Sequence, residues 1–465
     1  MAATGSYAHA HWSSRLTFIL AAVGSSVGLG NFWRFPFEVG RNGGGAFVLI
    51  YLFCILLVAL PLLLAEFAIG RRGQQSAVGS YRHVAVLSNR SPGWSAIGWL
   101  GMVVVFFTLA YYSVIAGWIV AYIPIIATGK LTGASAGDVG QIFANLQANP
   151  WLLTAGHAVF MAITTFIVAR GIKGGIELAV KILMPAFFVM LLLITIASGI
   201  IGDFAAGARF LLTPDFSKIT PLVVLSATGQ AFFSVGLTGA LMVTYGAYIT
   251  SDVNLPRAGL TIAFSDTLVA VIAGLAIFPI VFGFGLDASE GPGLLFVTLP
   301  VAFAQMGDGG LVFGLVFFLL ALFAALTSSI SVLEVATSWA EEKAGGQRAK
   351  VATILGFLAF LIGMLSVLGQ NVWSDIHPLS ALKMFEGLGI LDTFDTLLGK
   401  IMLPLTGVFV AIFAGWVASK EIFSEEFNFG NPRLFSIWRF LIRFVCPPAV
   451  LYILYLGIRG APVAG

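Results

Sequence analysis

The chain has 465 residues, of which 59% are hydrophobic and only 10% are charged, and its mean hydropathy is +0.99. Soluble globular domains carry roughly 25% charged residues, so this composition excludes a soluble globular domain and is typical of a polytopic membrane protein. The formal net charge of +3 is too small to suggest a nucleic-acid partner. The hydrophobic runs are continuous and not alternating, which excludes an outer-membrane barrel and predicts an all-α integral membrane protein.

The long hydrophobic stretches predict the spans. A spanning helix needs about 20 mainly apolar residues to cross a hydrocarbon core of about 30 Å. Eleven stretches qualify, at 16–38, 43–70, 96–127, 152–170, 176–201, 221–249, 258–285, 310–340, 349–369, 394–419 and 434–458. Arg71, Arg72, Arg82 and Arg90 follow the second span, whereas the opposite loops carry acids such as Asp375. The positive-inside rule therefore predicts a cytoplasmic N-terminus and a C-terminus outside.

The first predicted span is interrupted by small and polar residues. Residues 24–36 read GSSVGLGNFWRFP, with Asn31 and Arg34 where a span should be apolar. A cleaved signal peptide is disfavoured, because no small-x-small cleavage site precedes a polar mature start. A phosphate loop is disfavoured as well, because the third glycine and a preceding strand are missing. The stretch predicts a broken helix, with close packing of small residues as the alternative.

The sixth predicted span is interrupted in the same way. Residues 229–248 read GQAFFSVGLTGALMVTYGAY and place Ser234 and Thr238 in mid-membrane. The first span starts inside and the sixth, five crossings later, starts outside. Two broken helices that open five-helix units of opposite orientation predict an inverted repeat. We expect one transporter domain over 1–465, with repeats at about 12–201 and 221–419 and an additional span at 434–458.

A helix that is interrupted at membrane depth is energetically costly, so the interruption is expected to serve a function. Unpaired backbone there costs several kcal/mol per group and is tolerated where it lines a cavity or binds something. Freed carbonyls suit hard cations and freed N–H groups suit anions, so one site can hold both a sodium ion and a carboxylate. Asp266 is a second signal, because a carboxylate inside a span must be paired, protonated or bound to a metal. Thr327 and Ser328 either contribute here or bond back to their own helix.

Several motifs, taken in chain order, resemble those of the neurotransmitter:sodium symporter family. They are WSSRLTFILAAVGSSVGLGNFWRFP, NGGGAF, the pair Tyr111 and Tyr112, GQAFFS, AGLAIFP and ALTSS. The resemblance runs from about residue 12 to 458 and is strongest to bacterial amino-acid transporters with eleven spans. It implies the leucine-transporter-like fold, a five-plus-five inverted repeat with discontinuous first and sixth helices.

The resemblance also implies which residues bind. The first sodium site would use the Ser26 carbonyl, Asn31, Ser234 and Asp266. The second would use the carbonyls of Gly24, Val27 and Ala324 and the hydroxyls of Thr327 and Ser328. Such oxygen sets of low charge fit a monovalent hard cation better than calcium. The substrate carboxylate would contact Tyr112 and the N–H groups of Leu29 and Gly30. The substrate ammonium would contact the carbonyls of Ser26, Phe233 and Ser234. The side-chain pocket would be lined by Thr108, Phe233, Gly239, Ser328 and Val332.

Further positions are implied to work as gates or supports. Arg34 and Asp395 resemble an outer gate pair with Phe233 as the lid beneath it, and Glu66 would support the first helix break. His9 stands where the family often has an arginine that pairs with an acid near Glu341 or Glu342. Since histidine is only partly charged at neutral pH, that inner gate would be weaker or pH-sensitive. Gly175 and Pro185 form a G-x₉-P motif, which either unwinds to admit water or is an ordinary proline kink.

Departures from the family pattern narrow the substrate. Gly28 replaces the aspartate of amine-transporting relatives, which favours a substrate that brings its own carboxylate. Asp266 replaces an asparagine of chloride-dependent relatives, so we expect chloride independence. Gly236 lacks a hydroxyl that some members offer to the amine. Gly239 replaces a bulky residue, which predicts room for a branched or aromatic side chain, although Thr238 could refill part of it.

The sequence therefore predicts a sodium-coupled symporter of a hydrophobic or aromatic α-amino acid, working by alternating access in a bacterial inner membrane. Two sodium ions and no organic cofactor are expected. The alternative is a membrane sensor that binds an amino acid without transport, which only flux excludes. An enzyme is disfavoured, because the five histidines form no ligand cluster in the sequence. A homodimer is left open.

Overall fold

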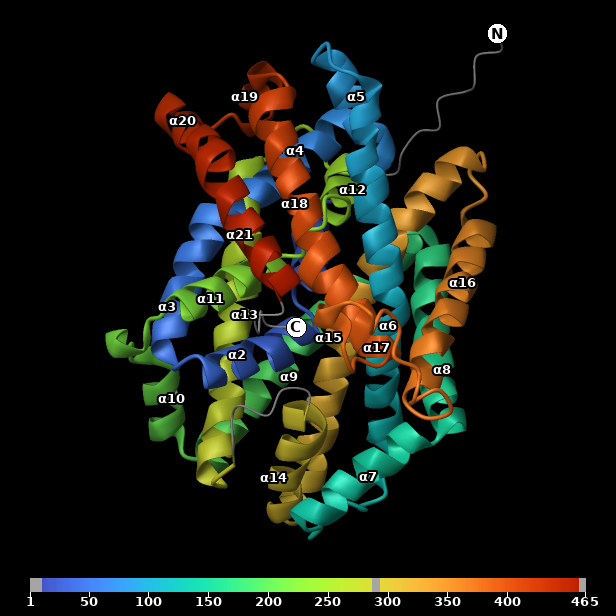
Figure 1. Ribbon diagram of the computed structural model, residues 1–465, viewed down its shortest axis with the longest axis vertical. Helices are drawn as coiled ribbons and strands as arrows, with labels where there is room; N and C mark the ends of the chain where they lie inside the picture. The colour runs from blue at the N-terminus through green and yellow to red at the C-terminus, as the bar shows by residue number, and fades with distance from the viewer. Residues whose placement is uncertain (1–10, 287–292, 460–465) are drawn as a thin grey trace.

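The protein is helical throughout the part that the computed structural model describes, residues 11–286 and 293–459. Within these residues the only extended pairing is an isolated bridge between Gly44 and Pro214. Figure 1 shows the long helices side by side, with α5 and α19 at one end of the bundle and α7 and α14 at the other. The predicted all-α fold is confirmed.

The helices follow the predicted spans. The first span consists of α1 (Arg15–Ser26), η1 (Gly30–Arg34) and α2 (Phe35–Arg41), and the second of α3 (Gly45–Cys54), η2 (Ile55–Ala59) and α4 (Leu60–Gly73). The third to fifth are α6 (Ala96–Ala127) after η3 (Pro92–Ser95), α8 (Pro150–Ala169), and η4 (Ile172–Ile176) with α9 (Glu177–Ile201). The sixth is α11 (Pro221–Ser234) and α12 (Leu241–Ala247), and the seventh to ninth are α13 (Leu255–Gly283), α15 (Asp308–Lys343) and α16 (Arg348–Gly369). The tenth is α17 (Ile390–Asp395), η8 (Thr396–Met402), α18 (Leu403–Ile412) and η9 (Phe413–Val417), and the eleventh is α20 (Pro432–Phe440), η10 (Leu441–Val445) and α21 (Cys446–Arg459).

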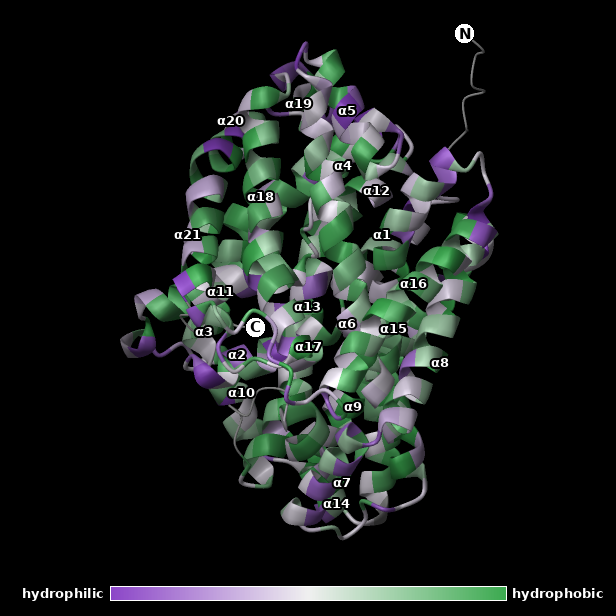
Figure 2. Ribbon diagram, turned by 45° about the vertical axis from the view of Figure 1, so that its right-hand side comes forward, coloured by the Kyte–Doolittle hydropathy of each residue, from purple (hydrophilic) through white to green (hydrophobic). Residues whose placement is uncertain are grey.

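Shorter helices connect the spans. They are α5 (Ala77–Leu87), α7 (Ala136–Ala148), α10 (Phe204–Leu212), η5 (Phe216–Lys218), η6 (Leu294–Thr298), α14 (Leu299–Gln305), η7 (Lys383–Phe385) and α19 (Lys420–Phe427). Figure 2 shows hydrophobic residues along the long helices, while hydrophilic residues gather toward their ends, as on α5, α19 and α7. Among the described residues, nine helices are long and apolar enough to cross a membrane. The bent first span adds a tenth, and the two short helices of the sixth span complete the predicted eleven.

Both predicted helix breaks are present. In the first span the axis bends by 52° between α1 and the helix that starts at Gly30. In the sixth span residues 235–240 are not helical, and Gly236 and Gly239 have φ of +70° and +72°, which side chains with a Cβ rarely adopt. At the start of the second half-helix the Thr238 hydroxyl accepts from the backbone N–H of Leu241 at 2.9 Å, which satisfies one free backbone donor.

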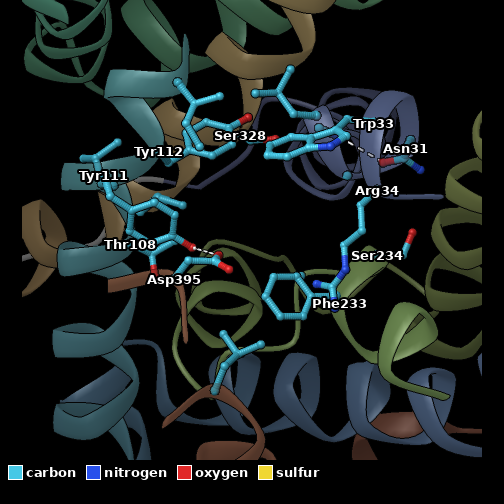
Figure 3. A pocket seen from close by; sticks show the side chains of 18 of the residues that line it. Asn31, Trp33, Arg34, Thr108, Tyr111, Tyr112, Phe233, Ser234, Ser328 and Asp395 are labelled. Atoms are coloured by element: carbon cyan, nitrogen blue, oxygen red, sulfur yellow. Dashed lines mark hydrogen bonds between the residues drawn. The ribbon is translucent and has the colours of Figure 1, made fainter. Parts of the chain in front are cut away.

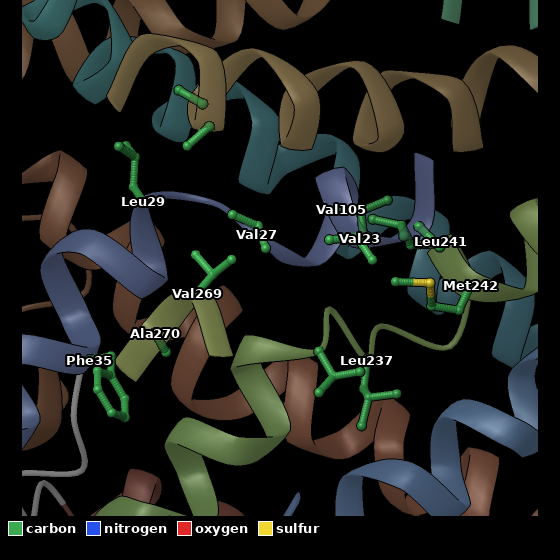
Figure 4. Close-up of a cluster of buried hydrophobic side chains, with 14 of the residues drawn as sticks. Val23, Val27, Leu29, Phe35, Val105, Leu237, Leu241, Met242, Val269 and Ala270 are labelled. Carbon is green, nitrogen blue, oxygen red and sulfur yellow. The ribbon is translucent and has the colours of Figure 1, made fainter. Parts of the chain in front are cut away.

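The two breaks lie together in the middle of the bundle. The Ser26 hydroxyl, at the end of α1, donates to the carbonyl of Val235 across the gap at 3.3 Å. Figure 4 shows the buried apolar side chains around this point, which are Val23, Val27, Leu29, Phe35, Val105, Leu237, Leu241, Met242, Val269 and Ala270. This packing holds two interrupted helices at a depth where neither could stand alone.

Candidate functional site

A cavity of about 450 Å³ opens beside the two breaks. Its wall includes residues from both interruptions, and these are Ser25, Ser26, Gly28, Leu29, Gly30, Asn31, Phe233, Ser234, Gly236, Leu237 and Thr238. The long third and eighth spans complete it with Thr108, Tyr111, Tyr112, Ser328 and Val332 (Figure 3). Nearly all of the predicted substrate-site residues are therefore brought together around one space.

A buried polar cluster borders the cavity. The Asp266 carboxylate of α13 is fully buried and accepts from the Asn31 amide at 3.0 Å and from the Ser234 hydroxyl at 2.5 Å. Tyr51 of α3, which the sequence analysis missed, donates its hydroxyl to Ser234 at 3.2 Å. The Asn31 amide oxygen in turn accepts from the Gly28 N–H at 3.1 Å. Three of the four residues predicted for a first sodium site, Asn31, Ser234 and Asp266, thus meet although they are up to 235 positions apart.

A second group of oxygens lies where α15 crosses the first break. The Ser328 hydroxyl is 3.4 Å from the Val27 carbonyl and 3.3 Å from the Ser25 carbonyl. The Thr327 hydroxyl donates to the Ala324 carbonyl at 3.0 Å, so part of its bonding stays within its own helix, as the alternative interpretation held. A Cβ added at Gly24 would lie 3.2 Å from the Thr327 Cβ. The residues predicted for a second sodium site are therefore neighbours.

The chemistry of these groups limits which ion they could hold. The residues that the structure describes contain no group of three or more His, Cys, Asp or Glu side chains suited to a metal ion. The donors at the two clusters are carbonyl, hydroxyl, amide and a single carboxylate oxygen. Hard oxygen donors of low total charge fit an alkali cation and not zinc, iron or copper.

Tyr112 and Gly28 lie next to each other in the wall of the cavity. The Tyr112 hydroxyl is buried and forms no hydrogen bond of standard geometry within residues 11–286 and 293–459, and the Leu29 N–H and the Ser328 hydroxyl are the polar groups next to it. A Cβ added at Gly28 would lie 3.6 Å from this hydroxyl and 2.7 Å from the Ser328 hydroxyl, whereas one added at Gly30 would meet nothing within 4 Å. An unpaired buried donor beside freed backbone N–H groups fits an anionic group of a ligand.

The expectation for Gly239 is wrong. Gly239 does not line the cavity: a Cβ added there would meet Val410 at 3.2 Å and Thr406 at 3.5 Å, on the tenth span. The wall at this point is formed by Thr238, with Leu237 and Leu241 beside it. A side chain at this position would point toward the tenth span and not into the cavity, so the small size of Gly239 does not enlarge the ligand space.

Glu66 supports the helix break of the sixth span and not that of the first span. We expected it beside the break of the first span. Its carboxylate instead accepts from the Gly239 N–H at 2.9 Å, in the break of the sixth span. Since Glu66 is buried on α4, it satisfies a backbone group that the interrupted helix leaves without a partner.

The end of the cavity toward α7 contains the predicted outer gate residues (Figure 3). The guanidinium of Arg34 lies over the Phe233 ring at 4.0 Å from its centroid. Asp395 accepts from the Tyr111 hydroxyl at 3.0 Å. Beyond them the wall includes residues that the sequence analysis missed, namely Trp118, Phe143, Gln147, Gln370 and Asp392. No motif marks these residues, because they come from separate elements, namely α6, α7, α17 and the end of α16.

The opposite end is closed by contacts that the sequence analysis did not find. The backbone N–H of Trp12 donates to the Tyr248 carbonyl at 3.1 Å, and the Tyr248 hydroxyl donates to Glu334 at 2.7 Å. Arg348 forms an ion pair with the fully buried Glu334 and a second one, at 2.9 Å, with Glu341. Glu342 accepts from the hydroxyl of Ser76 at 2.7 Å. The predicted partner His9 lies outside the described residues.

Arg348→Gln is expected to destabilise the protein markedly, because it leaves the Glu334 carboxylate buried without its cation. Breaking a buried pair by removing one partner typically costs about 3–5 kcal/mol. The measurement is the melting temperature of the purified protein. Lys350→Gln, two residues further on and exposed, is the control. Equal melting temperatures for Arg348→Gln and the parent chain would show that the pair contributes nothing.

The fifth span is helical through the G-x₉-P motif. Gly175 lies in the π-helical turn η4, and Pro185 lies inside α9. A Cβ at Gly175 would come within 2.0 Å of the Ile167 carbonyl, so the glycine permits close contact with the preceding chain. The segment from Gly175 to Pro185 is therefore helical, and not unwound, in this structure.

Interrupted spans whose broken ends meet at a cavity with buried oxygen donors define a secondary transporter. The chain matches the sodium:neurotransmitter symporter family over residues 9–139 and 137–461. It is 38% identical over 453 residues, 97% of each chain, to YhdH of Bacillus subtilis (strain 168), an uncharacterized sodium-dependent transporter. The crystal structure of MhsT in complex with L-phenylalanine is similar, with a TM-score of 0.86 and 40% identity, and the match covers 97% of this chain and 100% of that one. A mouse sodium-dependent neutral amino acid transporter, B(0)AT2, is 28% identical over 300 residues, 58% of this chain and 40% of its own.

The protein belongs to the sodium:neurotransmitter symporter family. It is therefore a multi-pass membrane transporter that depends on sodium, and not an enzyme. The predicted fold, with discontinuous first and sixth helices, is confirmed by the similarity to MhsT.

Proposed function

We propose that this protein is a symporter that moves an α-amino acid with a hydrophobic or aromatic side chain together with sodium. The observation that carries the proposal is the buried Asp266 carboxylate, which meets Asn31 and Ser234 where two interrupted helices expose their backbone. A carboxylate here, beside an unpaired Tyr112 hydroxyl, supports binding of a cation and an anionic ligand group side by side. The names of MhsT's ligand and of B(0)AT2 favour an amino acid.

Two sodium ions are proposed. The first would be held by Asp266, Asn31, Ser234 and the Ser26 carbonyl, and the second by the carbonyls of Gly24, Val27 and Ala324 with the hydroxyls of Thr327 and Ser328. The carbonyls become available because the first span stops being helical at Ser26. The substrate carboxylate would supply a further oxygen ligand to the first sodium ion, so substrate and sodium stabilise each other's binding.

The substrate is proposed to lie between the breaks, with its carboxylate at Tyr112 and the N–H groups of Leu29 and Gly30. Gly28 supplies no fixed carboxylate, so a protonated amine without its own carboxylate gains no ion pair at this position. Apolar wall residues surround the side-chain end, among them Val105, Leu237, Leu241 and Val332. Burial of apolar surface at about 25 cal/mol per Å² favours a large hydrophobic side chain over a small or charged one.

Alternating access is proposed to open the cavity at one end and then at the other. Arg34, Phe233 and Asp395 would close the outer end, and the group around Tyr248, Glu334 and Arg348, with Glu342 nearby, the inner end. We propose a bacterial inner membrane with the N-terminus in the cytoplasm, in keeping with the arginines after the second span. The repeats are proposed at about 12–201 and 221–419.

Uptake of radiolabelled amino acids into proteoliposomes tests this function. A panel of branched, aromatic, small and charged amino acids is offered with an inward sodium gradient, or with potassium at equal ionic strength. Accumulation of a branched or aromatic amino acid in sodium alone is the expected result. Sodium-dependent binding without uptake would favour the sensor alternative. Neither binding nor uptake of any amino acid would overturn the proposed substrate class.

Replacement of chloride by gluconate is expected to leave sodium-dependent binding unchanged within about twofold, because Asp266 supplies a fixed negative charge at the proposed first sodium site. The measurement is saturation binding of the best amino acid of the panel in sodium chloride and in sodium gluconate. A tenfold weaker affinity in gluconate would contradict chloride independence.

A further inference from the structure

Two arginines lie one helical turn apart inside the eleventh span. Arg439 is in α20 and Arg443 is in the π-helical turn η10. At 1.5 Å per residue, Arg443 lies about 16 Å along the helix from Pro432, well inside a span that begins at that residue. Charged side chains at such depth are costly and mark a binding or pairing function unless they are neutralised.

Arg443 is fixed against the end of the tenth span. Its Nε donates to the Gly415 carbonyl at 2.5 Å, and its guanidinium lies 5.9 Å from the Trp416 ring. Arg90, which follows α5, donates to the Val417 carbonyl of the same helix end at 3.4 Å. These bonds satisfy carbonyls that η9 leaves free where it terminates. Both arginines are thereby held at one place, on the side of the bundle where α21 lies beside α18 (Figure 1).

The positive charge of this group is not balanced within the described chain. Arg439 is half-buried, and its Nη1 is enclosed without a hydrogen-bond partner in residues 11–286 and 293–459. The charged groups that act on it are Arg443, which repels it, and Glu421, which is exposed. No ion pair of Arg90, Arg439 or Arg443 is found among the described residues. Glu421 is therefore the only carboxylate found to act on Arg439 among the described residues, and it forms no ion pair with that arginine.

The surface around the arginines faces lipid. Phe440 and Phe444, on the same helix stretch, are 57% and 58% exposed, and Trp416 is 44% exposed. Trp416 and Phe444 pack edge to face at 6.1 Å, so they form a rim next to Arg443. Exposed aromatic side chains beside basic ones are typical of the interface between headgroups and acyl chains.

We infer that Arg439 and Arg443, with Arg90 beside them, bind the phosphate group of an anionic phospholipid in the leaflet at the α5 and α19 end of the protein. Guanidinium groups bind phosphate oxygens through paired, charge-assisted hydrogen bonds. The lipid phosphate supplies the missing negative charge, and Trp416, Phe440 and Phe444 contact its glycerol and acyl chains. Free phosphate offers the same oxygens, but it gains nothing from the three exposed rings. The inference does not depend on the proposed substrate or on transport.

Native mass spectrometry of the purified full-length protein in detergent tests the inference. The protein is mixed with phosphatidylglycerol, with phosphatidylethanolamine or with inorganic phosphate, and the bound fraction is measured. The parent chain is expected to retain phosphatidylglycerol in preference to the other two. A basic residue at a membrane surface contributes about a fivefold change in anionic-lipid affinity, so Arg439→Gln should weaken retention about fivefold. The double variant Arg439→Gln with Arg443→Gln should weaken it more.

The controls separate lipid binding from loss of structure. Arg439→Gln breaks no hydrogen bond seen in the described residues, so its fold should be intact, which the elution profile checks. Arg433→Gln removes an exposed charge from the first turn of the same helix and should change nothing. Equal retention by the parent chain and the double variant would overturn the inference, and so would an equal loss with Arg433→Gln. Equal retention of phosphatidylethanolamine, or displacement of the lipid by millimolar phosphate, would overturn the assignment to an anionic lipid.

Discussion

Gly28→Asp is expected to abolish amino-acid binding. The new Cβ alone would lie 2.7 Å from the Ser328 hydroxyl, and the carboxylate would enter the space proposed for the substrate carboxylate. Two like charges about 4 Å apart repel by about 4 kcal/mol at an effective dielectric constant of 20, which corresponds to roughly a thousandfold weaker binding. The measurement is saturation binding of the preferred amino acid in sodium.

A matched control lies two residues away. Gly30 is in the same helix break, and a Cβ added there would meet nothing within 4 Å, so Gly30→Ala should keep binding within a few-fold of the parent chain. If the affinity of Gly28→Asp for the amino acid is within tenfold of that of the parent chain, the substrate carboxylate lies elsewhere. In that case amines without a carboxylate should be tested on both variants.

Asp266→Asn is expected to raise the sodium concentration for half-maximal substrate binding by at least about 30-fold, since removing one partner of a buried charge contact costs about 2–5 kcal/mol. Asparagine keeps the size of the side chain and can still bond to Asn31 and Ser234, so the effect should come from charge and not from packing. The measurement is sodium titration of amino-acid binding.

Added chloride and a control substitution of an exposed aspartate test whether the effect comes from the charge of Asp266. If the fixed charge of Asp266 replaces an anion, added chloride should restore part of the sodium affinity of Asp266→Asn while leaving the parent chain unaffected. Asp252→Asn changes an exposed carboxylate close to the sixth span and should leave the titration unchanged. An unaltered sodium titration in Asp266→Asn would place the first sodium ion away from this carboxylate.

Local sequence was sufficient for the spans and the breaks. Long apolar runs specify membrane helices by their length alone, and glycines with polar residues inside such a run, as at 24–36 and 229–248, specify where the helix is interrupted. The motifs were also sufficient to select many residues of the cavity, because the broken segments themselves form much of its wall. These properties depend on residues close together in the chain.

Tertiary structure decided what those residues face. Gly239 lies in a predicted break, but only the path of the backbone shows that its α-carbon faces Val410 and not the cavity. The choice of Glu66 for the sixth-span break depends on how α4 packs against that break. Tyr51 and Arg348 reach partners on other helices, Ser234 and Glu334, at separations that no local pattern encodes. The sequence by itself determined which helices span and where they break, because helix length and interruption are local properties. Only the packing of distant helices decided which side chains meet at the break, because burial and polar pairing depend on neighbours that the order of residues does not specify.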